Sequence, residues 1–274
     1  MFSIFKKKKI VPHIRLTGVI GSAGRFNKGI DLAGQREILK KAFSVKKITH
    51  VAISINSPGG SPVQSHLIYS YIRQLAEKNK VKVIIFAEDV AASGGYLISC
   101  AGDEIYANSS SIIGSIGVIS ASFGFKDLIK KIGIERRVYS EGKNKGLLDP
   151  FLPEKKDDII QIKRIQKDLH NQFISWVKFR RGKRLKAKDD ILFNAGIWSG
   201  IEAKKLGLID NIGDYYSVMK KKFGKEVKFK DFSKKTSWFK QRFLSEYKRD
   251  GHSVLVDHFF KAIDERIFWS RYGL

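Results

Sequence analysis

A serine in the stretch of residues 89–96 has the neighbours that a nucleophile needs. Ser93 follows the apolar run of residues 81–87 and stands between two alanines and two glycines. Small neighbours let a substrate backbone approach the hydroxyl group. The helix predicted for residues 94–101 would also direct free backbone amides toward it. The same residues fit an ordinary glycine-rich connection, so the stretch alone leaves both interpretations open.

A serine nucleophile needs a base for its proton and amide donors for the developing oxyanion. Gly59 and Gly60 follow a predicted strand end, and Gly94 follows the serine itself, so these three amides are the candidate donors. None of the histidines lies in a loop beside the glycine-rich stretches or has an obvious carboxylate partner, which disfavours a Ser-His-Asp triad. The six are His13, His50, His66, His170, His252 and His258.

A lysine is the alternative base. It must be neutral to accept a proton, and desolvation favours the neutral amine. Lys145 differs from most lysines of the chain because it lies in a glycine-bounded loop, residues 141–151, that leads into an apolar stretch. Lys143 is a rival in the same loop, and loop lysines are ordinarily exposed. Ser115 fits two roles equally: it could hold the amine in place, or it is a turn serine.

The elements around these residues alternate between strand and helix. This alternation predicts a parallel sheet with helices around it. Ligands of such sheets bind at the carboxyl ends of the strands, and both glycine-rich breaks, residues 56–60 and 91–95, fall at that end. We therefore expect the two breaks to face each other. The predicted strands are residues 11–20, 49–55, 81–87 and 104–107, and the predicted helices are residues 31–43, 62–78 and 94–101.

The remainder of the chain has weaker patterns. They predict a bent strand pair or turn at 109–119, a helix at 126–132, a strand at 136–139, a long amphipathic helix at 154–178, a helix–turn–strand at 198–213 and a helical tail from 238. The run of residues 178–188 carries seven positive charges. We interpret it first as solvated surface and second as a patch for anionic lipid, a partner or nucleic acid.

Composition limits the class of protein. The 274 residues suffice for one large domain or two modest ones. Cys100, the single cysteine, lies in an apolar helix and is expected to be buried filler. A net charge of +25, spread along the whole chain, favours nucleic acid or an anionic membrane as a partner without separating the two. The spacing of metal ligands and of phosphate or dinucleotide loops is missing, so we expect no metal and no cofactor.

The amino terminus and the hydropathy predict no membrane crossing. No run of about 18 uncharged apolar residues occurs, and the start lacks the apolar core of a secretory signal. Phe2, Ile4 and Phe5 stand beside four lysines, which suits a weak contact with a membrane surface. From these features we expect a cytoplasmic protein, free or peripheral on the inner face of the membrane.

Five stretches, in this order along the chain, resemble the signal peptide peptidase A family of Ser-Lys serine peptidases in its short, single-unit form. The family usually carries an amino-terminal membrane anchor, whereas this sequence begins with a short lysine-rich stretch. The matching stretches are residues 55–60, 91–96, 109–117, 142–151 and 198–213.

The resemblance implies an α/β fold: a Clp/crotonase-like spiral of βα units with a parallel sheet, plus C-terminal helices. It divides the chain into a basic segment (1–10), a peptidase domain (11–215) and a C-terminal helical extension (216–274). Residue by residue, it implies Ser93 as nucleophile, Lys145 as general base, Ser115 as the serine that positions the lysine, and Gly59, Gly60 and Gly94 as oxyanion-hole positions.

The resemblance also implies an endopeptidase for hydrophobic peptides, such as remnant signal peptides or membrane-derived fragments. It implies a homo-oligomer in which the lysine comes from the same subunit or a neighbour. Peripheral contact with anionic membrane fits the charge, and nucleic acid is the less favoured partner. Two alternatives stay open: a crotonase-type enzyme acting on acyl-CoA, and a non-catalytic basic scaffold that binds anionic membrane or nucleic acid.

Overall fold

The computed structural model of the chain describes residues 9–21, 29–142, 144–233, 269–270 and 272. These residues form two compact units. The first unit comprises the chain up to Ile116 and from Trp176 onward, and the second is Gly117–Ser175. The first unit contains the sheet, whereas the described secondary structure of the second is helical.

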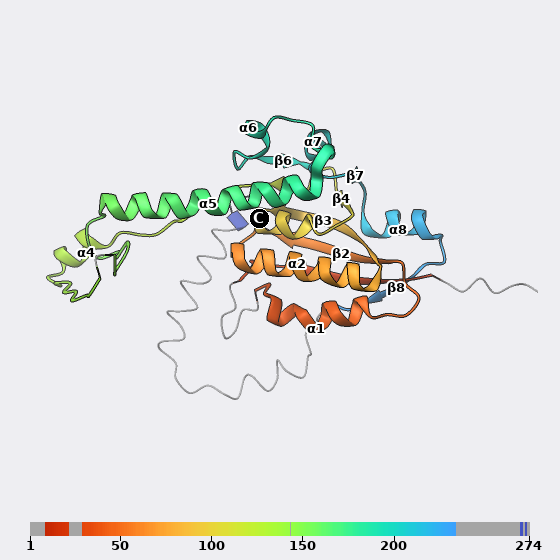
Figure 1. Cartoon of the computed structure of the whole chain (residues 1–274), viewed down its shortest axis with the longest axis horizontal. Coiled ribbons are helices and arrows are strands. Elements are labelled where there is room, and N and C mark those ends of the chain that lie inside the picture. Colours follow the sequence, from red (N-terminus) through yellow and green to blue (C-terminus); the bar gives the residue numbers. More distant parts are fainter. Residues whose placement is uncertain (1–8, 22–28, 143, 234–268, 271, 273–274) are drawn as a thin grey trace, which may run out of the picture. The chain divides into compact units, whose positions relative to one another are not determined.

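The first unit alternates strands and helices along most of its length (Figure 1). Its strands are β1 (Ile10–Thr17), β2 (His50–Ser57), β3 (Lys82–Ala92), β4 (Glu104–Ala107), β5 (Ile112–Gly114), β6 (Ile197–Ser199), β7 (Asn211–Ile212) and β8 (Lys228–Asp231). Its helices are α1 (Leu32–Phe43), α2 (Pro62–Asn79), α3 (Gly94–Ser99), α6 (Asp189–Leu192), α7 (Gly200–Leu206) and α8 (Tyr215–Phe223), with a 3₁₀ turn at Gly182–Arg184.

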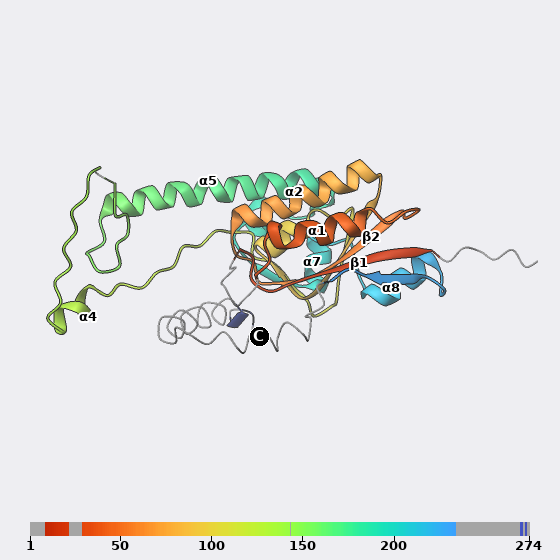
Figure 2. The ribbon, with the colours of Figure 1, turned by 90° about the horizontal axis from the view of Figure 1, so that it is seen from below.

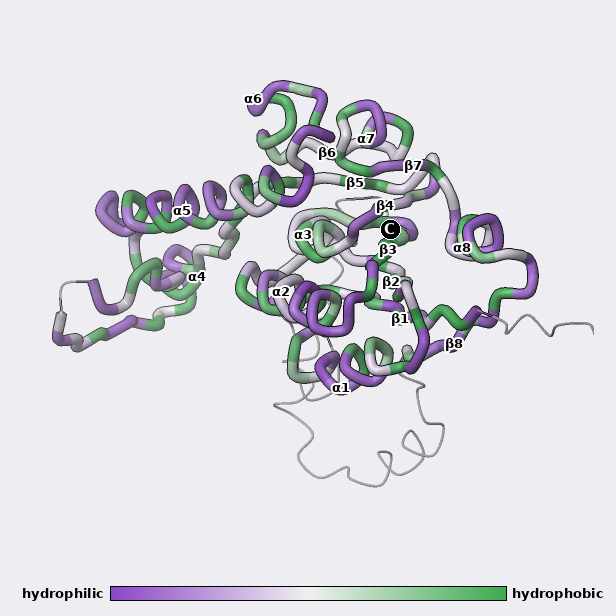
Figure 3. The backbone as a smooth tube through the Cα atoms, turned by 45° about the vertical axis from the view of Figure 1, so that its right-hand side comes forward, coloured by the Kyte–Doolittle hydropathy of each residue, from purple (hydrophilic) through white to green (hydrophobic). Residues whose placement is uncertain are grey.

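The second unit contains α4 (Lys126–Lys131) and most of α5 (Lys156–Arg181), whose last turns belong to the first unit. Figure 3 shows hydrophobic and hydrophilic residues alternating along α5, as expected for the amphipathic helix predicted at 154–178. None of the helices in the described ranges has the length and apolar run that crossing a bilayer requires.

The eight described strands form one sheet in the order β6-β5-β3-β2-β1-β8, with β4 beside β3 and β7 beside β4. Every pairing is parallel except that of β5 with β6. The long strand β3 pairs with β4 through its first half and with β5 through its last residues. The sheet therefore divides along β3, shortly before Ser93.

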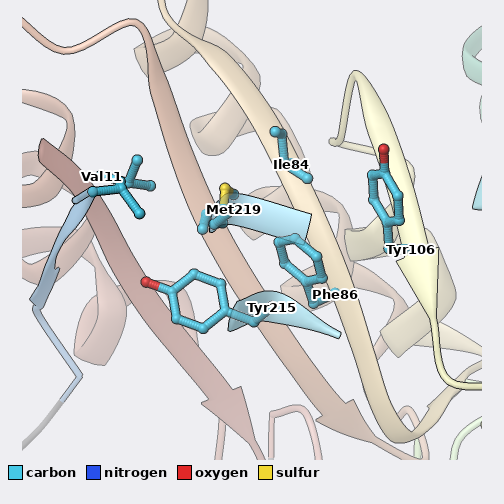
Figure 4. Packing of buried hydrophobic residues seen from close by; sticks show 8 residues of the cluster. Val11, Ile84, Phe86, Tyr106, Tyr215 and Met219 are labelled. Carbon is cyan, nitrogen blue, oxygen red and sulfur yellow. The ribbon is translucent and has the colours of Figure 1, made fainter. Parts of the chain in front are cut away.

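Helices cover both faces of the sheet. Figure 2 shows α1 and α2 on one face and α8 on the other. On the α8 face, Tyr215 and Met219 pack against Phe86 and neighbouring side chains of β1, β3 and β4 (Figure 4). The central strand β2 is buried from Val51 to Ser57. Burial on both faces explains why residues 51–57 carry no charged side chain and begin with three successive apolar residues.

The prediction of a parallel α/β fold is confirmed, and most elements begin and end within a few residues of their predicted limits. The predicted helix at 31–43 corresponds to α1, and Asp31 caps it by accepting a hydrogen bond from the Gly34 amide. Strand β3 extends to Ala92, beyond the predicted end at 87, because its last residues find a second partner in β5.

Two local predictions differ from the structure. Residues 136–139 form no strand: they are exposed, and the described part of the second unit offers no strand to pair with. The stretch 109–119 contributes only β5, whose antiparallel partner is β6 rather than an adjacent segment. A pairing between segments so far apart in the chain has no local sequence signal.

The C-terminal boundary at 215 also differs from the structure. Residues 215–223 form α8, but β8 follows and pairs with β1 in parallel as an edge of the same sheet. Residues 216–231 are therefore part of the α/β fold rather than a helical extension. The predicted helical tail from 238 lies mostly outside the described residues, and so do residues 1–8 of the basic segment.

Candidate active site

The candidate site begins at an irregularity between β2 and β3. The two strands are in regular register as far as Ile55 and Ala87, and pairing resumes only at Ser57 and Ala91. The side chain of Asn56 fills this gap: its Oδ1 accepts from the Val90 amide at 3.1 Å, and its Nδ2 donates to Asp89 at 2.6 Å. We call this pair of bonds the Asn56 clasp. It replaces the main-chain bonds that the bulge removes.

Ser93 stands immediately after β3 in a backbone conformation that L-residues rarely adopt. Its φ is 51° and its ψ is −122°, and its amide donates to the Gly114 carbonyl at 2.8 Å. A side chain held at positive φ stores about 1–3 kcal/mol of strain, and such residues are concentrated at functional sites. The residue is half-buried, and its hydroxyl forms no capping bond with α3. The sharp turn presents this hydroxyl at the carboxyl end of the sheet.

The glycine loop that follows β2 packs directly on Ser93. A Cβ on Gly59 would lie 2.7 Å from the Ser93 Cβ, and a Cβ on Gly60 would lie 2.1 Å from the Ile20 carbonyl oxygen. Both glycines also have positive φ, 106° and 142°. No other residue fits either position. The expectation that the two glycine-rich breaks face each other is therefore confirmed.

The amides of the loop differ in availability. The Gly59 amide donates to the Ser57 hydroxyl at 3.2 Å, whereas the Gly60 amide has no hydrogen-bond partner in the described part of the chain. The loop is fixed by bonds between Ile20 and the backbone on either side of Gly60. The first-turn amide of α3, that of Gly94, is next to Ser93 in the chain. Gly60 thus has the more available amide of the loop, and the Gly94 amide begins α3 directly after Ser93.

Ser115 occupies the equivalent position after the neighbouring strand. It follows Gly114, whose carbonyl accepts the Ser93 amide, and its own φ is also 51°. Its amide donates to the Gly196 carbonyl at 2.7 Å. Ser93 and Ser115 therefore leave adjacent parallel strands at the same edge of the sheet.

The helix behind Ser93 is anchored at two points. The Tyr96 hydroxyl, on a fully buried side chain, donates to the Leu208 carbonyl at 2.8 Å. At the other end, Arg180 donates to the carbonyls of Cys100 and Gly102, which follow the helix. Cations suit this end because the last carbonyls of a helix lack intrahelical partners. These contacts fix α3 and so fix the position of its amino-terminal amides.

The interpretation of residues 178–188 as solvated surface is wrong for three of its arginines. The Arg181 side chain is 1% exposed and forms an ion pair with Asp210 at 2.9 Å. Arg180 and Arg184 also donate to backbone carbonyls of the first unit. Burial, the largest single effect, would raise the pKa of Asp210, but the hydrogen bonds and charge of Arg181, the Ile105 amide and the charge of Arg184 together hold that pKa below its usual range. Sequence alone does not distinguish such anchoring arginines from solvated ones.

Cys100 is buried, as predicted, and burial raises the pKa of its thiol to about 11. The thiol is therefore protonated at neutral pH and unsuited to nucleophilic chemistry. Among the described residues, no group of three or more histidine, cysteine or carboxylate side chains is placed to hold a metal ion.

Three of the histidines within the described ranges contact residues other than Ser93. His50 stacks edge-on against Phe223, and His66 stacks on Trp176. His13 pairs with Ser54 at 2.9 Å and approaches Asp231 at 4.0 Å, an arrangement that the sequence did not reveal. Ser54, however, is 3% exposed and lies in the middle of β2 rather than at the end of a strand.

The segments that build the Ser93 site carry no lysine or arginine. Residues 51–72 contain no aspartate, glutamate, lysine or arginine, and residues 83–125 contain no lysine or arginine. A lysine base for Ser93 must therefore come from another part of the chain or from another molecule.

The predicted base, Lys145, belongs to the second unit. It is exposed there in a turn in which its amide donates to the Gly142 carbonyl at 3.0 Å. The loop continues to Leu148, whose amide donates to Asp158, and to Asp149, which pairs with Arg136. Lys143, the rival base, lies outside the described residues.

Comparison with known proteins decides the family. The model of peptidase family S49 matches residues 75–228, more than half of the chain. The chain belongs to peptidase family S49. The S49 match confirms the resemblance to signal peptide peptidases that the five ordered stretches indicated.

Two curated relatives show how much of their length this S49 chain matches. It is 48% identical over 273 residues to a Brucella melitensis protein named Na(+)/H(+) antiporter NhaA, covering 96% of this chain and 37% of that protein. It is 29% identical to a putative signal peptide peptidase SppA of Enterococcus faecium, covering 75% of this chain and 60% of that protein. The chain thus spans little more than a third of the first relative's length.

The structural comparison confirms the fold. A point mutant of the 1510-N membrane-bound stomatin-specific protease matches with a TM-score of 0.50 and 18% identity, covering 82% of this chain and 98% of that chain. At this identity, the similarity concerns the fold alone.

Proposed function

We propose that this S49 chain is a serine endopeptidase with Ser93 as nucleophile and Lys145 as general base. The observation that carries the proposal is the conformation of Ser93: a serine at positive φ after a parallel strand, packed against Gly59 and followed by the first amide of a helix. Nucleophiles on tight strand-to-helix turns present their hydroxyl in this way. Membership of a serine peptidase family supports the assignment.

In the acylation step, the Ser93 hydroxyl attacks the carbonyl carbon of the scissile peptide bond, and its proton passes to the neutral amine of Lys145. The amides of Gly60 and Gly94 donate to the oxygen as it becomes negative. The tetrahedral intermediate then collapses, the C–N bond breaks, and the Lys145 ammonium returns the proton to the leaving amine. The products are an acyl ester on Ser93 and a peptide fragment with a free amino terminus.

Deacylation repeats these roles with water. Lys145 removes a proton from a water molecule, whose oxygen attacks the ester carbonyl, and the same two amides stabilise the oxyanion. The ester bond breaks, Ser93 regains its proton from Lys145, and the carboxylic acid leaves. Ser115 is proposed to position the amine through its hydroxyl, since it leaves the strand next to Ser93.

A lysine base has to be desolvated, whereas Lys145 is exposed within its own unit. We therefore propose that the dyad forms in a homo-oligomer, with Lys145 covered when its loop meets a Ser93 site of the same or a neighbouring subunit. Large apolar side chains of the second unit support self-association. Those most exposed include Phe123 (63%), Leu128 (54%), Ile132 (61%) and Ile134 (56%).

The surface beside the glycine loop supports a hydrophobic substrate. Val63 and Leu67, one turn apart at the start of α2, are 62% and 40% exposed. The segment around them, residues 51–72, carries no aspartate, glutamate, lysine or arginine. Exposed aliphatic groups on an uncharged segment favour hydrophobic peptides, such as remnant signal peptides or membrane-derived fragments.

Hydrolysis of hydrophobic fluorogenic peptides tests the proposal. Ser93→Ala should lower turnover by several orders of magnitude, as loss of a nucleophile does in other serine peptidases. The matched control is Ser110→Ala, which alters an exposed serine. Two results would overturn the proposal. One is peptidase activity of the Ser93→Ala variant equal to that of the wild type. The other is a wild-type protein that hydrolyses acyl-CoA but no peptide.

A further inference from the structure

The two ends of the sheet differ in charge. The carboxyl ends of β2 and β3 lie in segments without lysine or arginine, residues 51–72 and 83–125. The amino ends of the same strands are preceded by short connections rich in lysine. We refer to the exposed lysines there as the lysine end. They are Lys9, Lys46, Lys47, Lys78, Lys80, Lys82, Lys220, Lys221, Lys222, Lys225 and Lys228.

The sheet register places lysines from distant parts of the chain at one edge. Lys82 pairs with His50 at the start of β2 and β3, and the Lys228 amide donates to the Lys9 carbonyl at the start of β1 and β8. The connections before β2 and β3 contribute Lys46 and Lys80. In Figure 1 this is the end of the first unit near the label of β8.

Helix α8 adds its last turn to the same edge. The Phe223 ring lies 4.9 Å from that of His50, and the Lys9 amine lies 5.6 Å from the Phe223 ring. Burial lowers the pKa of His50, and the nearby charges of Lys82 and Lys222 lower it further. Lysines of three separate segments therefore surround the start of β2.

The acidic residues of this edge neutralise only a small part of it. Glu77 and Asp103 pair with Arg73, and Glu104 pairs with Lys222. Each of these carboxylates already has a cationic partner. Glu226 stands within the lysine end itself, but it is a single negative charge among many lysines. Most of the lysine end is consequently left as a positively charged surface in solvent.

The composition of the lysine end favours lipid over nucleic acid. The exposed cations of this edge are lysines, whereas Arg73 is held by Glu77 and Asp103. Arginine is the residue that binds phosphate in bidentate fashion and reads or stacks on bases. Lysine, a mobile point charge, suits the diffuse negative surface of a bilayer. Ile10, 39% exposed, adds an apolar side chain among the lysines, as lipid interfaces favour.

We propose that the lysine end docks this protein on an anionic lipid bilayer, with the Ser93 edge of the sheet at the opposite end of the strands. Strands β2 and β3 run from the membrane-facing edge toward the candidate active site, so lipid binding leaves the Ser93 edge free. This proposal does not depend on the peptidase activity.

Vesicle sedimentation with two charge-matched variants tests it. The end variant carries Lys46→Gln, Lys78→Gln, Lys82→Gln and Lys225→Gln. The control variant carries Lys163→Gln, Lys167→Gln, Lys188→Gln and Lys204→Gln, all exposed and all outside the lysine end. Both have a net charge of 25 − 4 = +21. Circular dichroism and thermal unfolding establish that both remain folded.

Wild-type protein should sediment with vesicles of phosphatidylcholine and phosphatidylglycerol, and much less with phosphatidylcholine alone, and binding should fall as salt rises. If each lysine contributes about fivefold, the end variant should lose roughly two to three orders of magnitude in partition coefficient. The control variant should lose less than about tenfold.

Three outcomes would overturn the proposal. One is absence of wild-type binding to the phosphatidylglycerol vesicles at every salt concentration. Another is an equal loss in both variants, which would assign binding to the overall net charge. The third is that the wild-type protein binds duplex DNA or RNA more tightly than vesicles in the same salt series, and that the end variant loses this nucleic-acid binding.

Discussion

The surroundings of Ser93 and those of Lys145 differ in how firmly they are built. Ser93 leaves a buried strand, its amide is bonded to Gly114, and Gly59 packs on its Cβ. Lys145 stands in an exposed turn whose described main-chain bond is local, from its amide to Gly142. The nucleophile half of the proposed dyad is thus preorganised by the sheet, whereas the base half is not desolvated within its own unit.

This difference explains how one chain can combine a strained serine with a distant lysine. Strain at Ser93 is tolerated because the sheet, the Asn56 clasp and the arginines behind α3 determine its position. A base supplied by a separate loop becomes active only when that loop is covered. We therefore expect variants at the Ser93 side to act through stability or through the position of the glycine loop. Variants at the Lys145 side should act through the chemistry or the assembly.

Loss of the base should have the largest effect on chemistry. Lys145→Ala should lower kcat for peptide hydrolysis by about 10²- to 10⁴-fold, the usual contribution of a general base, without lowering thermal stability. Lys143→Ala, in the same loop, is the matched control and should retain activity. Near-normal activity of Lys145→Ala together with loss in Lys143→Ala would reverse the assignment of the base.

Removal of Arg181 should damage the Ser93 side through stability. Arg181→Ala leaves the largely buried Asp210 without its main partner, which should lower the free energy of unfolding by about 3–5 kcal/mol. Urea denaturation measures this change. Lys178→Ala breaks the exposed pair with Asp189 and should cost less than about 1 kcal/mol. Equally small losses of unfolding free energy in Arg181→Ala and Lys178→Ala would show that Arg181 does not anchor the structure behind α3.

The Arg181–Asp210 pair also predicts a pH dependence of stability. Because the pKa of Asp210 is lower in the folded state than its ordinary value of 3.8, its contribution to stability is fully present above about that value. It is lost as the pH falls through the lower, folded-state pKa. Urea midpoints measured between neutral and strongly acidic pH should therefore decline less in Asp210→Asn than in the wild type.

The Asn56 clasp should affect catalysis more than stability. Asn56→Ala removes both bonds that bridge the bulge, and a displacement of the glycine loop should lower kcat about tenfold to a hundredfold, with little change in KM. Asp89→Asn retains an acceptor for the Asn56 amide and should change kcat by less than about threefold. If the two variants have the same activity, the clasp does not position the loop.

The exposed apolar side chains of the second unit should control self-association. Ile132→Ser with Ile134→Ser should weaken the oligomer, detected by sedimentation velocity across a concentration series. Ile201→Ser, similarly exposed on α7 of the first unit, is the control and should leave association unchanged. A monomeric wild-type protein that hydrolyses peptides would contradict assembly as the source of the covered lysine.

The sequence predicted the parts that follow from local pattern. Apolar runs located β2 and β3, Asp31 located the start of α1, and the two glycine-rich breaks predicted the meeting of Gly59 with Ser93. What it missed depends on partners distant in the chain. The end of β3 depends on β5, β8 depends on β1, and Arg181 depends on Asp210. The roles of Ser93, Lys145 and Ser115 stay predictions.

Covalent labelling of Ser93 by a serine-reactive phosphonate tests the central claim most directly. Mass spectrometry of peptides would locate the label, and its rate would be measured in the wild type, Lys145→Ala and Lys143→Ala under conditions in which the protein is oligomeric. We predict modification at Ser93 in the wild type and in Lys143→Ala, slowed by at least about 10²-fold in Lys145→Ala. Labelling at another serine, or an equal rate without Lys145, would contradict the Ser93–Lys145 dyad.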